Sequence, residues 1–130
     1  MIDELYETIG GNRTVWAATE IFYRRVMQDD VLKHFFESTN VAHLQARQSM
    51  FVSMLLGGRV VYTGKEIGEA HAKARVQGLT DAHFDRFLAH FREALGEVGV
   101  KPDKAEKVMD LLEARRAVVL NRPKSFKANP

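Results

Sequence analysis

A stripe of apolar residues between Thr80 and Gly99 limits the fold of this chain more than any other feature. Its members recur every three or four positions: Phe84, Phe87, Leu88, Phe91, Leu95 and Val98. This spacing places the side chains on one face of an α-helix. Thr80 is suited to cap the start of that helix, and Gly99 to end it. A helix with such a face needs other elements with matching apolar faces to pack against.

Other segments of the chain show helical periodicity too, and none shows the sustained two-residue alternation of a strand. The remaining expected helices cover residues 3–9, 12–27, 41–56, 67–74 and 102–119. Asn12 and Asn40 are the expected N-caps of the second and third of these, and Pro102 is expected in the first turn of the last. Asp30 is expected to cap a short turn that follows the second helix. The sequence therefore predicts an all-α fold.

The length of 130 residues is that of one domain, expected over residues 1–120, with a flexible tail over 121–130. A net charge of +2 does not indicate a nucleic-acid partner. The absence of cysteine excludes disulfides and thiolate metal sites. No apolar run reaches the roughly 18 residues of a membrane span, and the first residues do not resemble a signal peptide. We therefore expect a cytoplasmic protein.

His71 is the first candidate for a chemical role, because it lies in a helix too short to be stable alone. One histidine does not make a zinc site, which needs three or four close ligands. One histidine is enough for haem iron, because the porphyrin supplies the in-plane nitrogens. In that role its second ring nitrogen should donate to a nearby backbone carbonyl. On local sequence alone, a solvent-facing histidine is the commoner outcome, and that alternative stays open.

Two further polar residues lie on apolar faces. Gln48 interrupts the stripe of Leu44, Phe51 and Leu55, and Tyr23 lies near the inward face of its helix. Buried side chains of these types need hydrogen-bond partners, so both could donate to a small polar ligand or be ordinary satisfied boundary residues. The phenylalanines suit either a packed core or a flat apolar cofactor. The other histidines are predicted not to be ligands: His34, His43, His83 and His90.

Several motifs, in this order and spacing, resemble the group I truncated haemoglobins, which are two-over-two helical globins. The resemblance covers about residues 4–120. The segments that resemble the family are LYETIGG, IFYRRVMQDDVLKHFF, the pair Gly57-Gly58 with the YTG at 62–64, and EAHAKARVQGLTDAHFDRFLAHF. The resemblance implies a two-over-two helical sandwich around haem.

The resemblance also implies a role for individual residues. His71, and not His83, becomes the iron ligand on the side called proximal. Tyr23 and Gln48 become hydrogen-bond donors to the gas on the opposite, distal side, where Leu44 also lies. The other positions implied to contact haem are Phe35, Phe36, Arg47, Phe51, Leu55, Tyr62, Ile67, Arg75, Phe84 and Phe87.

Three departures from the family pattern change the expectations. Leu44 stands where the family often has glutamine, so the polar role passes to Tyr23 and Gln48. Arg47 stands where some relatives have a histidine that binds the iron, and arginine is a poor ligand because it stays protonated. We therefore expect no second internal ligand. No histidine follows His90, so we expect non-covalent haem b and not the covalent attachment of some relatives.

The function expected from the resemblance is reversible binding of oxygen, carbon monoxide and nitric oxide, for transport, storage or sensing. One alternative is a nitric oxide dioxygenase that forms nitrate, or a peroxidase-like side activity. Dioxygenase turnover needs an external reductase, because the chain has no GxGxxG signature of its own. A haem-free helical interaction module is the third interpretation. We expect a monomer.

Overall fold

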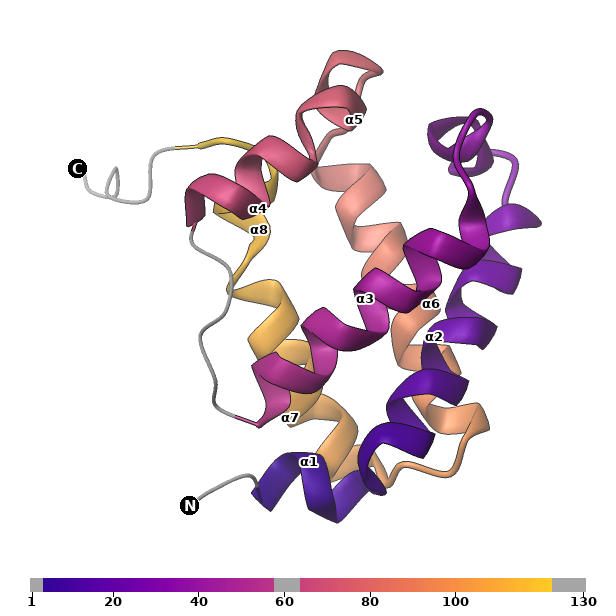
Figure 1. Cartoon of the computed structure of the whole chain (residues 1–130), viewed down its shortest axis with the longest axis vertical. Helices are drawn as coiled ribbons and strands as arrows, with labels where there is room; N and C mark the ends of the chain where they lie inside the picture. The colour runs from indigo at the N-terminus through magenta and orange to yellow at the C-terminus, as the bar shows by residue number, and fades with distance from the viewer. Residues whose placement is uncertain (1–3, 58–63, 123–130) are drawn as a thin grey trace.

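The computed structural model describes residues 4–57 and 64–122 (Figure 1). Within these ranges every regular element is a helix, which confirms the all-α prediction. None of the helices in this part of the chain combines the length and the hydropathy needed to cross a bilayer. The predicted Tyr62 contact and most of the predicted tail lie outside the described residues.

The elements follow one another along the chain with short connections. They are α1 (Glu4–Ile9), α2 (Gly11–Met27), the 3₁₀ helix η1 (Lys33–Phe36), α3 (Val41–Leu56), α4 (Gly64–Ala70), α5 (Ala72–Val76), α6 (Asp81–Glu97), α7 (Pro102–Glu113) and α8 (Arg116–Val119).

Two pairs of helices form the body of the fold. α2 packs against α3, α6 packs against α7, and the pairs are joined by the contact of α2 with α6. α1 closes one end against α2, α3 and α7. In Figure 1, α3 runs obliquely across the front of the molecule, with α6 behind it and α4 and α5 above it. This is the two-over-two arrangement that the resemblance implied.

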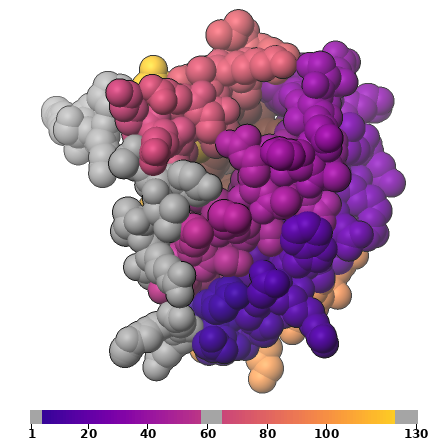
Figure 2. Space-filling view, in the orientation of Figure 1, coloured from indigo at the N-terminus to yellow at the C-terminus, as the bar shows by residue number. Residues whose placement is uncertain are grey.

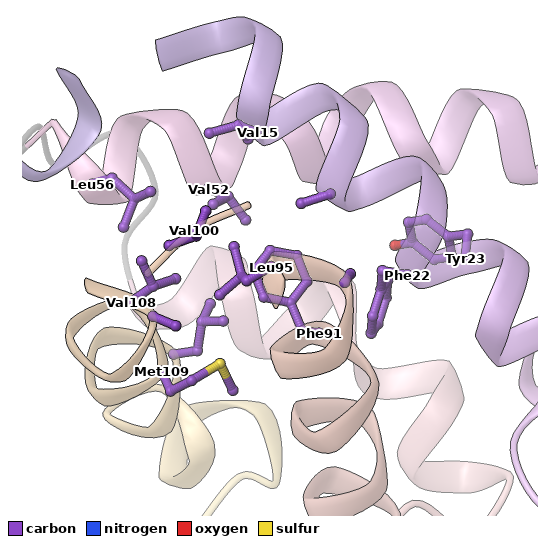
Figure 3. Packing of buried hydrophobic residues seen from close by; sticks show 14 of the residues in the cluster. Val15, Phe22, Tyr23, Val52, Leu56, Phe91, Leu95, Val100, Val108 and Met109 are labelled. Carbon is purple, nitrogen blue, oxygen red and sulfur yellow. The ribbon is translucent and has the colours of Figure 1, made fainter. Parts of the chain in front are cut away.

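The core lies where these pairs meet (Figure 3). The predicted inward face of α2 is buried, and it consists of Val15, Ala18, Phe22 and Val26. α6 contributes Phe91 and Leu95, and the ring of Phe91 lies edge-on to that of Phe22 with centroids 5.6 Å apart. α7 adds Val108 and Met109. Helical periodicity therefore identified the packed faces of these helices.

The caps agree with the sequence in part. Asn40 accepts a hydrogen bond from the His43 amide at 3.0 Å, and Pro102 begins α7, as predicted. Asn12 is not a cap: α2 begins one residue earlier, after Gly10. Gly10 has φ of 116°, and a Cβ there would collide with the Thr14 side chain, so this entry into the helix requires glycine.

Two predicted helices are each divided in the structure. The helix expected over 67–74 is two helices, α4 and α5, with His71 between them at φ −104° and ψ 6°. The helix expected over 102–119 ends at Glu113 and restarts as α8. α8 is turned so that Arg116 bonds Asp81 at the start of α6, at 2.9 Å. The contact of Arg116 with Asp81 thus favours the break between α7 and α8. Local periodicity in the sequence cannot reveal a contact between residues so far apart.

Asp29, and not Asp30, organises the turn after α2. Its Oδ1 accepts from the Val31 amide at 2.9 Å and from Arg86 at 2.9 Å. Its Oδ2 accepts from Arg86 at 3.0 Å and lies 2.8 Å from His90 Nε2. The pKa of Asp29 lies far below its usual range, and the hydrogen bonds from Arg86 are the largest cause of this shift. The Asp29 carboxylate therefore joins the end of α2 to α6.

We expect Asp29→Ala to lower the free energy of unfolding by about 2–4 kcal/mol at neutral pH, because Arg86 and His90 lose a buried acceptor. A pKa depressed by folding means that the contribution is complete above the unfolded value of about 3.9 and is lost as pH falls toward the folded value. The difference in the free energy of unfolding between wild type and variant should therefore shrink in acid. Urea unfolding at several pH values measures this difference. Asp30→Ala is the control, because that side chain is 89% exposed and its one ion pair among the described residues is with Lys33. Equal losses for both variants would contradict the assignment.

Candidate functional site

The imidazole of His71 is held by its own turn of helix. Its Nδ1 lies 2.8 Å from the carbonyl oxygen of Ile67. A carbonyl only accepts, so Nδ1 carries the proton and Nε2 keeps its lone pair. No residue in the described ranges bonds Nε2. The bond that sequence analysis predicted is therefore present, and it leaves the ring in the form that ligates metals.

The surroundings of His71 keep the ring neutral. Burial lowers the pKa of His71, and the positive charge of Arg75 lowers it further. The hydrogen bond to Ile67 raises this pKa but does not outweigh the other two effects. Arg75 was predicted to contact a cofactor. In the structure its Nη1 donates to the carbonyls of Gly68 and Val119, at 2.9 and 2.8 Å. Its contact with a cofactor stays a prediction.

His71 has no companions that could complete a metal site. Among the described residues, no three histidine, cysteine, aspartate or glutamate side chains lie close enough together to hold an ion. A metal bound at Nε2 must therefore bring most of its donors with it. Haem does so, because the porphyrin nitrogens fill the plane around the iron.

The apolar stripe of α3 that the resemblance assigned to the haem site is only half-buried, and it consists of Leu44, Gln48, Phe51 and Leu55. The fully buried residues of α3 are instead Ser49, Val52 and Leu56. The core contacts of α3 therefore lie on a neighbouring face, and the haem contacts that the resemblance implied for the stripe stay predictions. A mostly apolar face left half open is a surface that favours an apolar ligand.

Three other elements also carry half-buried apolar residues that were predicted to contact haem: Phe36 of η1, Ile67 of α4 and Phe87 of α6. The rings of Phe36 and Phe87 lie edge-on, with centroids 6.0 Å apart. In the part of the chain that the structure describes, α3 and α4 are not a closely packed pair. Figure 2 shows the surface hollowed between α3 and the α4–α5 segment. The elements α3 and α4, which carry predicted haem contacts, thus border a hollow in the surface.

Tyr23 has a buried ring and a hydroxyl that no described residue pairs. The residue is 5% exposed, and its ring packs edge-on against Phe22 and Phe36, with centroids 4.8 and 5.8 Å away. Burial raises the pKa of Tyr23 above its usual value, against the charge of Arg47, so the hydroxyl stays protonated. Neither this hydroxyl nor the Gln48 amide bonds another described residue. Among the described residues, Ser53 Oγ is the only fully buried side-chain oxygen or nitrogen without a hydrogen-bond partner. The Tyr23 hydroxyl oxygen also has no partner among these residues, so it must be at least slightly exposed.

Three other predicted contact residues have different surroundings. Arg47 is exposed, although its charge reaches Tyr23. Phe84 is buried beneath the Arg116 guanidinium, whose central carbon lies 4.7 Å from the ring centroid. Phe35 is buried with its ring centroid 5.1 Å from that of His83. Contacts of these three residues with a cofactor stay predictions.

The remaining histidines have structural contacts. His83 Nδ1 accepts from the Thr80 amide at 3.0 Å and so helps to cap α6. Sequence analysis missed this role, although the three-residue spacing is that of a capping box. His90 bonds Asp29, the His34 ring lies 4.0 Å from that of Phe35, and His43 is exposed.

Comparison with known proteins covers nearly the whole chain. Residues 4–121 match the family model described as bacterial-like globin. The chain is 35% identical over 118 residues to a group 1 truncated hemoglobin of Tetrahymena pyriformis, which covers 91% of this chain and 95% of the relative. It is 39% identical over 100 residues to group 1 truncated hemoglobin GlbN of Synechocystis sp., covering 76% and 81%.

Solved structures agree with these matches. The 2/2 hemoglobin from Synechococcus sp. PCC 7002, in the cyanomet state and with covalently attached heme, has a TM-score of 0.83 at 33% identity and covers 91% of this chain and 98% of that one. The Fe(III) form of truncated hemoglobin from Tetrahymena pyriformis has a TM-score of 0.80 at 33% identity and covers 92% and 98%.

Proposed function

Because the chain belongs to the bacterial-like globin family and is a haem-binding globin similar to group 1 truncated haemoglobins, we propose that His71 is its iron ligand and that it reversibly binds oxygen and other diatomic gases. The observation that supports this most directly is the imidazole of His71, whose Nδ1 donates to Ile67 and whose Nε2 is bonded by no described residue. The half-open apolar faces of α3, α4 and α6 suit the porphyrin.

Haem, when bound, supplies a ferrous iron that takes up diatomic gases reversibly. The side chains of Phe36, Ile67 and Phe87 exclude water from the site. The Tyr23 hydroxyl and the Gln48 amide would be the hydrogen-bond donors to a gas held there, and such bonds would strengthen with any negative charge on the gas. Arg47, being exposed, is suited to a haem propionate or to solvent.

We also propose that the haem is held without a covalent bond. The Synechococcus relative has covalently attached heme. This chain has no cysteine and no histidine after His90. The resemblance implies that covalent attachment uses a histidine on the last helix. The last helices of this chain, which follow His90, contain no histidine.

Nitric oxide dioxygenation would use the same site and the same donors. It differs from reversible binding in its product, nitrate, and in its need for an external reductase. Mixing the oxygen-loaded protein with nitric oxide and measuring nitrate decides whether the reaction occurs. Repeated turnover with a flavin reductase decides whether it is catalytic.

The absorption spectrum of the protein reconstituted with haemin tests the proposed function. We expect a Soret band in the ferric form and, after dithionite reduction, a single broad visible band, because one histidine is available to the iron. Acid butanone should extract all of the colour, since no covalent bond retains it. Sharp split bands on reduction would show a second internal ligand and contradict the distal assignment. A colourless protein that takes up no haemin would contradict haem binding.

A further inference from the structure

We propose that Arg75 is a positioning residue for His71: its guanidinium ties the turn that contains the histidine to α8 and so fixes where the imidazole stands. This inference rests on the proposed function, because it concerns the residue proposed to ligate the iron. Its basis is a set of hydrogen bonds between residues of α4, α5 and α8.

The Arg75 guanidinium and the His71 backbone share one acceptor. The carbonyl of Gly68 receives Arg75 Nη1 at 2.9 Å and the His71 amide at 3.2 Å. The Arg75 amide in turn donates to the His71 carbonyl at 3.1 Å. A charged donor makes the stronger hydrogen bond, so Arg75 holds the carbonyl that closes the turn at His71.

The same guanidinium nitrogen reaches across to the end of α8. Nη1 donates to the carbonyl of Val119 at 2.8 Å, 44 residues away in the sequence. The backbones approach closely here, since a Cβ added to Gly68 would lie 3.6 Å from the carbonyl oxygen of Val118. Arg75 therefore bridges α4 and α8 at the point where they meet.

The turn at His71 lies between two short helices. α4 has 7 residues and α5 has 5, and helices of this length are marginal without tertiary contacts. No residue of α5 is buried. Ala74 is the half-buried residue of α5 that packs against the core. The polar bridge through Arg75 therefore adds a constraint on the His71 turn, beside the bond from the ring itself to Ile67.

α8 is itself anchored, so the bridge ends on a fixed support. Arg116 of α8 bonds Asp81 at 2.9 Å and also pairs with Asp85 and Glu113. Its guanidinium lies over the ring of Phe84. The contacts thus run from the His71 turn through Arg75 and α8 to the start of α6.

The substitution that tests this inference should leave the fold intact. A groove of about 390 Å³ lies beside the bridge, lined by Lys65, Glu69, Arg75 and Arg122 among others. Water can enter that space when the guanidinium is removed, so truncation leaves no empty cavity and the two carbonyls stay hydrated.

The test compares Arg75→Gln, Arg75→Lys and Arg122→Gln with the wild-type holoprotein. Two quantities are measured: the iron–histidine stretching band in resonance Raman spectra of the reduced protein, and the rate of haem transfer to apomyoglobin. For Arg75→Gln we expect a shifted and broadened band and haem loss about 10–100-fold faster, the range typical of residues that orient a metal ligand. Arg75→Lys keeps a charged donor, which can reach one carbonyl, so it should lie between Arg75→Gln and wild type.

Arg122→Gln is the matched control, because Arg122 lines the same groove but bonds Asp81 and not the His71 turn. It should leave the band unchanged. A wild-type band and wild-type haem loss in Arg75→Gln would overturn the inference. Equal effects in Arg122→Gln and Arg75→Gln would overturn it too, since the cause would be a general loosening of α8. If the Soret band is the same in the wild type and in a variant without His71, the proposed function is overturned instead.

Discussion

His71→Gly should abolish haem binding at the affinity of the wild type, and this is the largest effect that we expect of any single substitution. In the described part of the chain, His71 is the imidazole that combines a bonded Nδ1, a free Nε2 and half-open apolar faces nearby. Glycine leaves no donor there, and among the described residues no cluster of three histidine, cysteine, aspartate or glutamate side chains could hold the metal instead. Haemin titration should show little or no Soret band at concentrations that saturate the wild type.

Two controls separate loss of the ligand from loss of the fold. His43→Gly removes an exposed histidine at the start of α3 and should keep the wild-type spectrum before and after reduction. Imidazole added to His71→Gly should restore part of the Soret band, because it can occupy the space that the side chain leaves. If His71→Gly binds haemin like the wild type, His71 is not the ligand.

Tyr23→Phe should speed oxygen dissociation by about 10–100-fold, which corresponds to the loss of one hydrogen bond worth about 1.4–2.8 kcal/mol. The hydroxyl has no partner in the described structure, and its raised pKa keeps it a donor. Phenylalanine retains the ring that packs against Phe22 and Phe36, so the effect should come from the hydroxyl alone. Stopped-flow displacement of oxygen by carbon monoxide measures the rate.

Tyr6→Phe is the matched control for this prediction. It makes the same chemical change at a half-buried tyrosine of α1, at the closed end of the helical body. Its oxygen dissociation rate should equal that of the wild type. An unchanged rate in Tyr23→Phe would remove Tyr23 from the distal site and leave Gln48 as the candidate donor.

The histidines show how much of the site could be predicted from sequence. The short, weakly helical segment singled out His71, and the resemblance to truncated haemoglobins made it the ligand. The predicted bond from its ring to a backbone carbonyl is present because residues four apart on a helix are neighbours. Its place in a break between two helices was not predicted, since the break depends on contacts with α8.

The α3 stripe shows where sequence reasoning reached its limit. Periodicity correctly placed Leu44, Phe51 and Leu55 on one face, but it could not say what covers that face. The core takes the neighbouring face with Val52 and Leu56, and the predicted stripe is left half open. A stripe that faces a cofactor and a stripe that faces the core have the same pattern in sequence, because both are apolar and helical.

The sequence by itself determined where most helices lie, several of their caps and the family resemblance. These depend on residues within a few positions of one another, where spacing and backbone propensity act directly. Only the tertiary structure decided which face of α3 stays open, that Asp29 receives Arg86 and His90, and that Arg75 reaches Val119. Those contacts join residues far apart in the chain, and they depend on how the helices pack. No local pattern encodes that packing.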